Sequence, residues 1–242
     1  MAKKRRLDGG GGEAMAKQLA LDRIEAARVS LDDSVDLDGA LTDRKGFTYA
    51  SRAPILAKLC TCTFVTKLDL DYNDIAVLPD AIGALTNLKE LNLDGNKIVT
   101  LPASIGRLTA LETLNLDSNI LTAVPSSIGC LTSLTTLDLI SNELTVLPDE
   151  IGKLTNLEHL WLSCNKLNAL PDSIGKLTGL KTLSLDNNQL TTLPESIVKL
   201  TNLTEFELFR NGHFNRSAQS AAVQAWLQAL EDSAKCDVDI RC

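Results

Sequence analysis

Hydrophobic and polar residues recur along most of this chain with one fixed spacing. Seven asparagines and six prolines each stand 23 residues apart. They are Asn73, Asn96, Asn119, Asn142, Asn165, Asn188 and Asn211, with Pro79, Pro102, Pro125, Pro148, Pro171 and Pro194. The repeating unit reads LxxLxLxxNxLxxLPxxIGxLxx. A register kept over seven units predicts a repeat architecture in which each unit stacks on its neighbours.

Each unit predicts one short strand followed by a turn. In Leu91-Asn92-Leu93 the apolar residues alternate with a polar one, so a strand directs the leucines inward and Asn92 outward. The other apolar positions complete an inner face that only stacking can bury. Asn96 follows the strand, where its amide can satisfy the turn and link to the next unit. Pro102 fixes φ, which suits a non-helical turn onto the opposite side.

A glycine follows the inner isoleucine in five of the units, where the fold needs room or a permissive backbone. These glycines are Gly83, Gly106, Gly129, Gly152 and Gly175. Val198 takes this place in the sixth unit, and the sequence alone gives no reason for the exception.

The units resemble leucine-rich repeats, in the 23-residue form with an LPxxIG second half that is typical of Ras-group proteins. The resemblance covers about residues 59–214. A leader of about sixty residues precedes the repeats, and this layout most resembles the Ras suppressor branch of the family. The resemblance implies an α/β solenoid, a horseshoe with a parallel concave sheet of about seven strands and a C-terminal capping helix.

Both ends of such a solenoid need a cap that covers apolar surface. We expect residues 1–12 to form a disordered tail that is basic and glycine-rich, and residues 13–58 to form a helix and cap region. Residues 13–31 predict a loosely attached helix with Met15, Leu19, Ile24 and Ala27 near one face. Residues 35–37 are a candidate for a short covering strand.

Residues 215–242 predict a C-terminal capping helix and tail. Ser217 is the expected N-cap of a helix that runs to about Ala234. Val223, Trp226 and Leu230 fall on one face of this helix, so Trp226 is expected to cap the solenoid. Residues 236–242 are expected to be irregular.

Composition and charge narrow the class of function. The 242 residues carry a formal net charge of −7 and include no apolar run long enough to span a membrane. The acidic body disfavours nucleic acid as a partner. Neither a secretory signal nor a lipidation motif is visible, so we expect a cytoplasmic protein with reduced cysteines. We also expect it to be monomeric. The tract Lys3-Lys4-Arg5-Arg6 leaves nuclear import open.

The residues that carry chemistry form no recognisable catalytic or metal-binding pattern. His159 and His213 stand in neither a Ser/His/Asp arrangement nor a zinc-ligand spacing. No phosphate-binding loop is present. We therefore expect no enzyme activity, no cofactor and no metal.

The outward positions of the predicted strands point to a protein-binding surface. Over seven strands they hold eleven acidic and four basic residues, and apolar or aromatic residues interrupt this acidity. The predicted site comprises Ile140, Trp161, His159, Asp138, Asp94, Asp117, Tyr72 and Phe209. Aromatic anchors among charges are typical of interaction hot spots, and the acids attract a basic or mixed basic and apolar protein surface. A solvated acidic face that aids only solubility is the alternative.

Three functions follow from this reading. The first, implied by the resemblance, is a non-catalytic scaffold or adaptor for protein–protein interaction in intracellular signal transduction. The second is a regulatory or targeting subunit that holds an enzyme, such as a protein phosphatase, on the concave face. The third is an enzyme whose site the sequence does not reveal.

Overall fold

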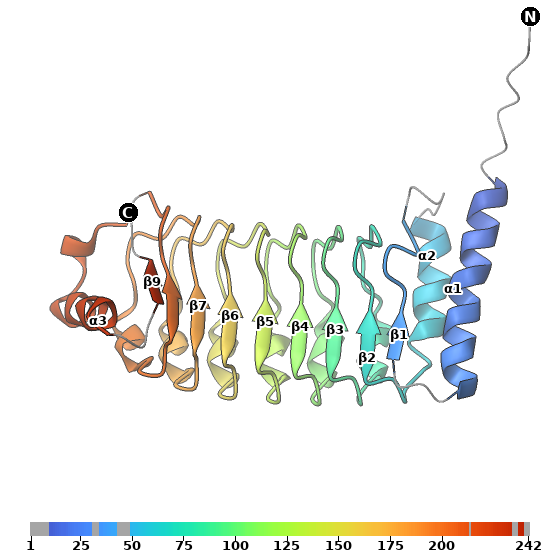
Figure 1. Cartoon of the computed structure of the whole chain (residues 1–242), viewed down its shortest axis with the longest axis horizontal. Coiled ribbons are helices and arrows are strands. Elements are labelled where there is room, and N and C mark those ends of the chain that lie inside the picture. The colour runs from blue at the N-terminus through green and yellow to red at the C-terminus, as the bar shows by residue number, and fades with distance from the viewer. Residues whose placement is uncertain (1–9, 31–33, 43–48, 213, 234–236, 240–242) are drawn as a thin grey trace, which may run out of the picture.

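The computed structural model describes residues 10–30, 34–42, 49–212, 214–233 and 237–239. They form a horseshoe solenoid with a parallel sheet along one face and 3-10 helices along the opposite face (Figure 1). Each strand pairs with the strands before and after it in the chain. The strands are β1 (Ser34–Asp36), β2 (Lys67–Asp69), β3 (Glu90–Asn92), β4 (Thr113–Asn115), β5 (Thr136–Asp138), β6 (His159–Trp161), β7 (Thr182–Ser184), β8 (Glu205–Glu207) and β9 (Asp237–Asp239).

The seven predicted repeat strands are β2 to β8, and they pair in the predicted register. The central residue of β3, Leu91, lies opposite Leu114 of β4, one repeat further along. Two further strands extend the sheet to nine. β1 contains part of the candidate covering strand and pairs with β2. β9 pairs with β8, so the expectation that residues 236–242 are wholly irregular was wrong.

The core lies between the sheet and the 3-10 helices. The central side chains of the repeat strands are buried, as are the isoleucines of the six repeat helices. The 3-10 helices are η2 (Asp80–Ala84), η3 (Ala103–Arg107), η4 (Ser126–Cys130), η5 (Asp149–Lys153), η6 (Asp172–Lys176), η7 (Glu195–Lys199) and η8 (Arg216–Ala218). Pro79 immediately precedes η2, where its carbonyl accepts a hydrogen bond from Ile82 N–H at 3.0 Å. The turn predicted as non-helical is thus a 3-10 turn.

The glycine column marks the closest approach between neighbouring coils. A Cβ atom on Gly152 would lie 2.5 Å from the carbonyl oxygen of Ser173 in the next coil. Val198 lies in η7, the last of the six repeat helices, against which the helix α3 (Ala221–Glu231) packs in place of a further repeat helix. Its side chain packs partly buried against the core. The exception therefore falls at the coil where the close stacking of repeat helices ends.

The N-terminal cap is built from two helices, α1 (Gly10–Ser30) and α2 (Tyr49–Leu59). α1 lies against α2 and β1, with Ile24 fully buried, so the expectation of a loosely attached helix was wrong (Figure 1). The predicted face was also partly wrong, because Met15 and Leu19 are exposed and Ala20 is buried with Ile24 and Ala27. Residues 10–12 belong to α1 and not to a tail. The basic tract at residues 3–6 lies outside the described residues.

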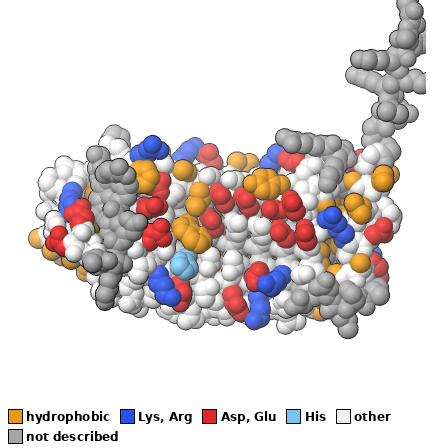
Figure 2. All heavy atoms as spheres, in the orientation of Figure 1, with side chains coloured by type: hydrophobic (Ala, Val, Ile, Leu, Met, Phe, Trp, Pro, Cys, Tyr) orange, Lys and Arg blue, Asp and Glu red, His pale blue; other side chains and the backbone are white. Residues whose placement is uncertain are grey.

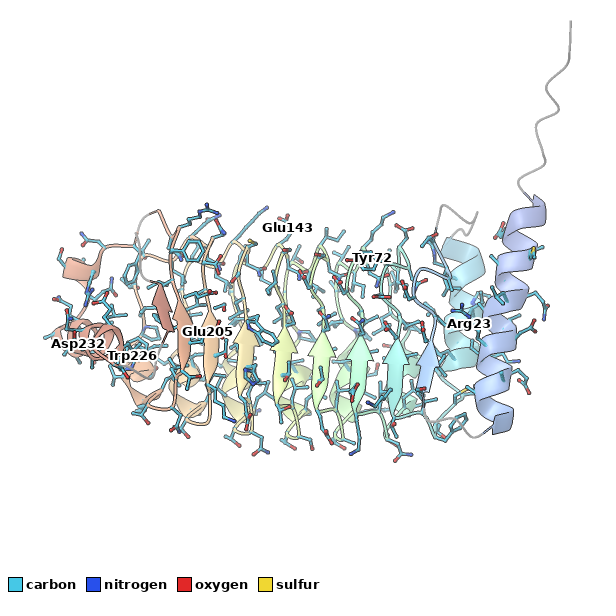
Figure 3. All side chains as sticks on the ribbon, viewed as in Figure 1. Arg23, Tyr72, Glu143, Glu205, Trp226 and Asp232 are labelled. Carbon is cyan, nitrogen blue, oxygen red and sulfur yellow. The ribbon has the colours of Figure 1, made fainter. Side chains whose placement is uncertain are left out.

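The C-terminal cap begins later than predicted. Ser220 is the N-cap of α3, and Ser217 lies in the short helix η8. α3 ends at Glu231, before the predicted end at Ala234. Trp226 packs edge-on against Phe206 of the last repeat strand, with ring centroids 5.3 Å apart. Trp226 therefore covers the end of the core, as its position on the helix predicted (Figure 3).

Candidate functional site

The asparagine ladder fixes each strand relative to its neighbours and so positions the outward side chains. Asn142 Oδ1 accepts a hydrogen bond from Leu121 N–H at 2.9 Å. Its Nδ2 donates to the carbonyls of Leu116, Leu139 and Ile140 at 2.9, 3.2 and 2.9 Å. Leu116 and Leu121 belong to the preceding coil. The ladder thus links each coil to the one before it, whereas the sequence analysis predicted a link to the next unit.

Two aromatic side chains of β6 form the centre of the predicted site. The rings of His159 and Trp161 are stacked, with centroids 5.6 Å apart and an interplanar angle of 16°. Asp138 of β5 lies opposite Trp161 in the strand register. Ile140 follows β5, and its N–H donates to Asp138 Oδ1 at 3.0 Å. The structure therefore brings these four predicted residues together on two adjacent coils. We call His159 and Trp161 the aromatic centre.

A hydrogen-bond relay that the sequence reading missed holds the aromatic centre. His159 Nδ1 lies 3.0 Å from Thr182 Oγ1, and Thr182 Oγ1 donates to Glu205 Oε2 at 3.1 Å. Because the Thr182 hydrogen points to Glu205, its oxygen accepts from His159, which assigns the proton of a neutral ring to Nδ1. The three residues stand 23 apart. That shared column was the signal that could have revealed them.

Ion pairs between adjacent strands neutralise one rim of the concave face. Lys67 pairs with Glu90 at 2.7 Å, Lys89 with Glu112 at 3.0 Å and Lys181 with Glu158 at 2.6 Å. These pairs account for three of the eleven acids of the predicted surface. Acidic charge is therefore not uniform across the sheet.

The remaining carboxylates of β2 to β5 form a strip that lacks a cationic partner among the described residues. This acidic strip consists of Asp69, Asp71, Asp94, Asp117 and Asp138. Figure 2 shows acidic side chains gathered over the middle of this part of the sheet. Asp69 and Asp138 each accept the backbone N–H two residues further on, from Asp71 at 3.2 Å and from Ile140 at 3.0 Å. Such turns orient the acids but leave their charge uncompensated.

Burial and the charges of neighbouring acids raise the pKa of three carboxyl groups of the strip, those of Asp71, Asp94 and Asp138. Burial, a hydrogen bond with Asp38 and the charges of Asp69 and Asp94 raise the pKa of Asp71 to about 7. Burial, followed by the charges of Asp117 and Asp94, raises the pKa of Asp138 to about 6 despite its bond to the Ile140 N–H. A cation that settles on the strip would relieve this repulsion.

The other two predicted aromatic residues, Tyr72 and Phe209, lie near opposite ends of the sheet. Tyr72 follows β2, is 56% exposed and hydrogen-bonds to Asp94 (Figure 3). Phe209 follows β8, where the Arg210 guanidinium lies 5.6 Å from its ring centroid. These two residues belong to strands six positions apart in the sheet, or about 29 Å at ~4.8 Å per strand. They cannot form one compact site with each other.

No chemistry beyond binding emerges from the described part of the chain. No group of three or more His, Cys, Asp or Glu residues there is placed to hold a metal ion. Burial and the neighbouring Cys62 raise the pKa of the Cys60 thiol to about 11, which disfavours a reactive thiolate. The arrangement offers an aromatic and acidic surface on a rigid sheet.

No helix within the described ranges is both long enough and apolar enough to cross a membrane.

A stacked solenoid with an asparagine ladder and an open parallel sheet defines a solenoid repeat protein. The protein family described as "Leucine-rich repeat region" matches residues 51–147 and 147–216 of this chain. The chain belongs to the leucine-rich repeat family, whose members generally mediate protein–protein interaction. Comparison with curated proteins gave no match.

Solved structures show the same architecture in proteins of different origin. A leucine-rich repeat protein of Leptospira interrogans is 38% identical with a TM-score of 0.53, over 62% of this chain and 44% of that one. The plant peptide hormone receptor RGFR1, solved in complex with RGF2, is 30% identical with a TM-score of 0.55, over 61% of this chain and 29% of the receptor.

An internalin from Listeria monocytogenes matches in fold, with 24% identity and a TM-score of 0.61, over 77% of this chain and 50% of the internalin. This chain thus spans half or less of each of these three proteins.

Proposed function

We propose that this chain is a non-catalytic scaffold or adaptor in intracellular signal transduction that binds another protein on its concave face. The observation that carries the proposal is the half-buried aromatic centre, which lies beside Ile140 and at the end of the acidic strip. Aromatic side chains framed by polar residues are the composition of binding hot spots. The plant receptor solved with RGF2 supports the use of this fold for protein or peptide ligands.

The partner surface is proposed to be basic, or mixed basic and apolar. The acidic strip speeds the encounter with a positively charged protein, and the aromatic centre with Ile140 supplies the contact that holds it. Nucleic acid is the wrong charge for this surface.

Two further features of the proposal concern subtype and compartment. The LPxxIG half of the repeats and the leader before them support membership of the Ras-group type, with a layout like that of the Ras suppressor branch. Among the described residues the thiols of Cys60, Cys130 and Cys164 are free, which supports a reducing compartment such as the cytoplasm. We propose a monomer, because the apolar ends of the repeats are covered by α1, α2 and α3.

Affinity purification with two matched variants tests the proposal. Trp161→Ala removes the larger ring of the aromatic centre and is expected to weaken partner binding by about 2 kcal/mol, or about thirtyfold. Val146→Ala removes an exposed apolar side chain outside the strands and should leave binding unchanged. If the Trp161→Ala chain recovers the same partners in the same amounts, the concave site is not the binding site.

The identity of the captured proteins separates the adaptor from the second candidate role. An adaptor recovers partners of several kinds. If a single catalytic chain, such as a phosphatase, is retained by the wild-type chain and lost from Trp161→Ala, the protein is a regulatory or targeting subunit.

A further inference from the structure

Carboxylates flank the aromatic centre on both sides. Asp138 lies opposite Trp161 on β5, and Glu207 occupies the same register position on β8, two strands beyond. Among the described residues neither carboxylate forms an ion pair. Figure 2 shows the histidine drawn in pale blue beside hydrophobic side chains, with acidic side chains on either side of this group. An aromatic surface is thus enclosed by uncompensated negative charge.

The strand between the aromatic centre and Glu207 carries only small outward residues. Thr182, Ser184 and Asp186 of the β7 coil are each less than a tenth exposed. Thr182 donates to Glu205, and Asp186 accepts a hydrogen bond from Ser163. The Thr182 hydroxyl and the Asp186 carboxylate are thus already hydrogen-bonded within the protein. A ligand at this place therefore meets the ring of Trp161 and the carboxylates of Asp138 and Glu207 as its available partners.

These surroundings discriminate between kinds of anchor. A purely apolar anchor would cover Trp161 and desolvate the neighbouring carboxylates without any compensating charge, which is costly. A lysine brings a compact and strongly hydrated charge. An arginine brings a planar guanidinium that stacks on aromatic rings and forms paired hydrogen bonds with carboxylates, while its apolar stem can cover Ile140.

We propose that the partner anchors itself here with an arginine side chain, whose guanidinium stacks on the aromatic centre and pairs with Glu207. This inference deepens the proposed function and rests on it. β6 and β8 are two strand spacings apart, or roughly 10 Å. This spacing is short enough for a guanidinium seated on the indole to reach the Glu207 carboxylate.

The relay through Thr182 gives this arginine site its geometry. His159 is held by Thr182, and the stacked His159 ring in turn restricts the Trp161 ring. A surface that is ordered before binding loses less conformational entropy when the ligand arrives. Thr182 is a positioning residue, because it is 4% exposed and acts through His159.

Binding of short synthetic peptides to the full chain provides the direct test. The probes are acetyl-Gly-Gly-Arg-Gly-Gly-amide and its lysine and citrulline counterparts, followed by NMR of the indole N–H groups. The chain has two tryptophans, and Trp226 serves as an internal reference because it is buried against Phe206. We expect millimolar binding. The arginine peptide should shift the indole N–H signal of Trp161 but not that of Trp226. It should bind about threefold more tightly than the lysine peptide, and the uncharged citrulline peptide should not bind.

Three variants separate the parts of the site. Trp161→Leu keeps an apolar side chain without a ring and should abolish the preference for arginine over lysine. Glu207→Gln should weaken the arginine peptide and flatten its salt dependence, while the control Glu195→Gln, on the opposite face in η7, should change neither. Thr182→Val should broaden or split the Trp161 signal and weaken arginine binding, and Thr182→Ser should restore both.

Different results overturn the inference and the proposed function. Equal binding of the arginine and citrulline peptides, or no shift of Trp161 by any peptide, overturns the arginine anchor. In that case partner capture that still depends on Trp161 leaves the concave binding function standing. Capture that is indifferent to Trp161→Ala overturns the function as well. Thermal unfolding of each variant shows whether the fold is intact.

Discussion

The inward and outward sides of the same strands follow different rules. The inward residue at the centre of a repeat strand is leucine in β2 to β7 and Phe206 in β8, and all are buried. The outward residues change from strand to strand, since Asp138 lies opposite Trp161, which lies opposite Ser184. An inward residue must fit the next coil, whereas an outward residue meets solvent or a partner. Changes inside should therefore cost stability, and changes outside should cost binding.

The largest expected loss of stability on the inward side is at the asparagine ladder. Asn142→Ala leaves the N–H of Leu121 and the carbonyls of Leu116, Leu139 and Ile140 without their partner. At about 1–3 kcal/mol for an unsatisfied buried group, we expect the free energy of unfolding to fall by about 3 kcal/mol. Denaturation in urea measures this loss. An unchanged midpoint would contradict a structural role for the ladder.

The next largest effect is at the glycine column. In Gly152→Ala the new Cβ would clash with the Ser173 backbone in the next coil, so the coils must move apart. We expect a loss of about 1–3 kcal/mol in the free energy of unfolding. Val198→Ala is the comparison, because this position lies where the stack of repeat helices ends. Equal losses in the two variants would show that the glycines are not required by close packing.

The sequence predicted the repeats well because their physical causes repeat. The spacing placed the strands, the register and the ladder, as Leu91 opposite Leu114 illustrates. The caps have no such period. Met15 and Leu19 fit a helical face as well as Ala20 does, and only the position of α1 against α2 decides that the small residue is buried.

The candidate site was predictable to the extent that it follows from register. The register placed Asp138 beside Trp161, and the structure agrees. The relay from His159 through Thr182 to Glu205 depends on side-chain rotamers, which spacing does not determine. Likewise, the division of the acids into an ion-paired rim and an unpaired strip depends on which carboxylates the flexible lysines reach, as Lys89 reaches Glu112.

Outside the core, the acidic strip should affect the rate of binding more than the fold. Asp94→Asn combined with Asp117→Asn removes two negative charges and is expected to slow association with a basic partner several-fold at low salt. The difference should shrink as ionic strength rises, because salt screens the strip. Stopped-flow or surface-binding kinetics with the captured partner measure this. The matched control combines Asp172→Asn with Glu195→Gln, which removes two charges from the opposite face, on η6 and η7. Slowing by the control to the same extent would mean that only net charge matters.

The smallest expected effect is a pH dependence of stability at Asp71. Burial, the hydrogen bond with Asp38 and nearby acids raise its pKa from 3.8 to about 7, so the folded chain holds this proton more tightly than the unfolded chain. The resulting stability is fully present below pH ~4 and is lost as the pH rises through ~7. Asp71→Asn cannot ionise. It should equal the wild type at pH ~3.5 and exceed it at pH ~8 by less than about 1 kcal/mol, since solvent screens the charge. Urea denaturation at both pH values, with Asp80→Asn on η2 as the control, measures the difference. A gain of the same size at both pH values would show that the proton on Asp71 is not the cause.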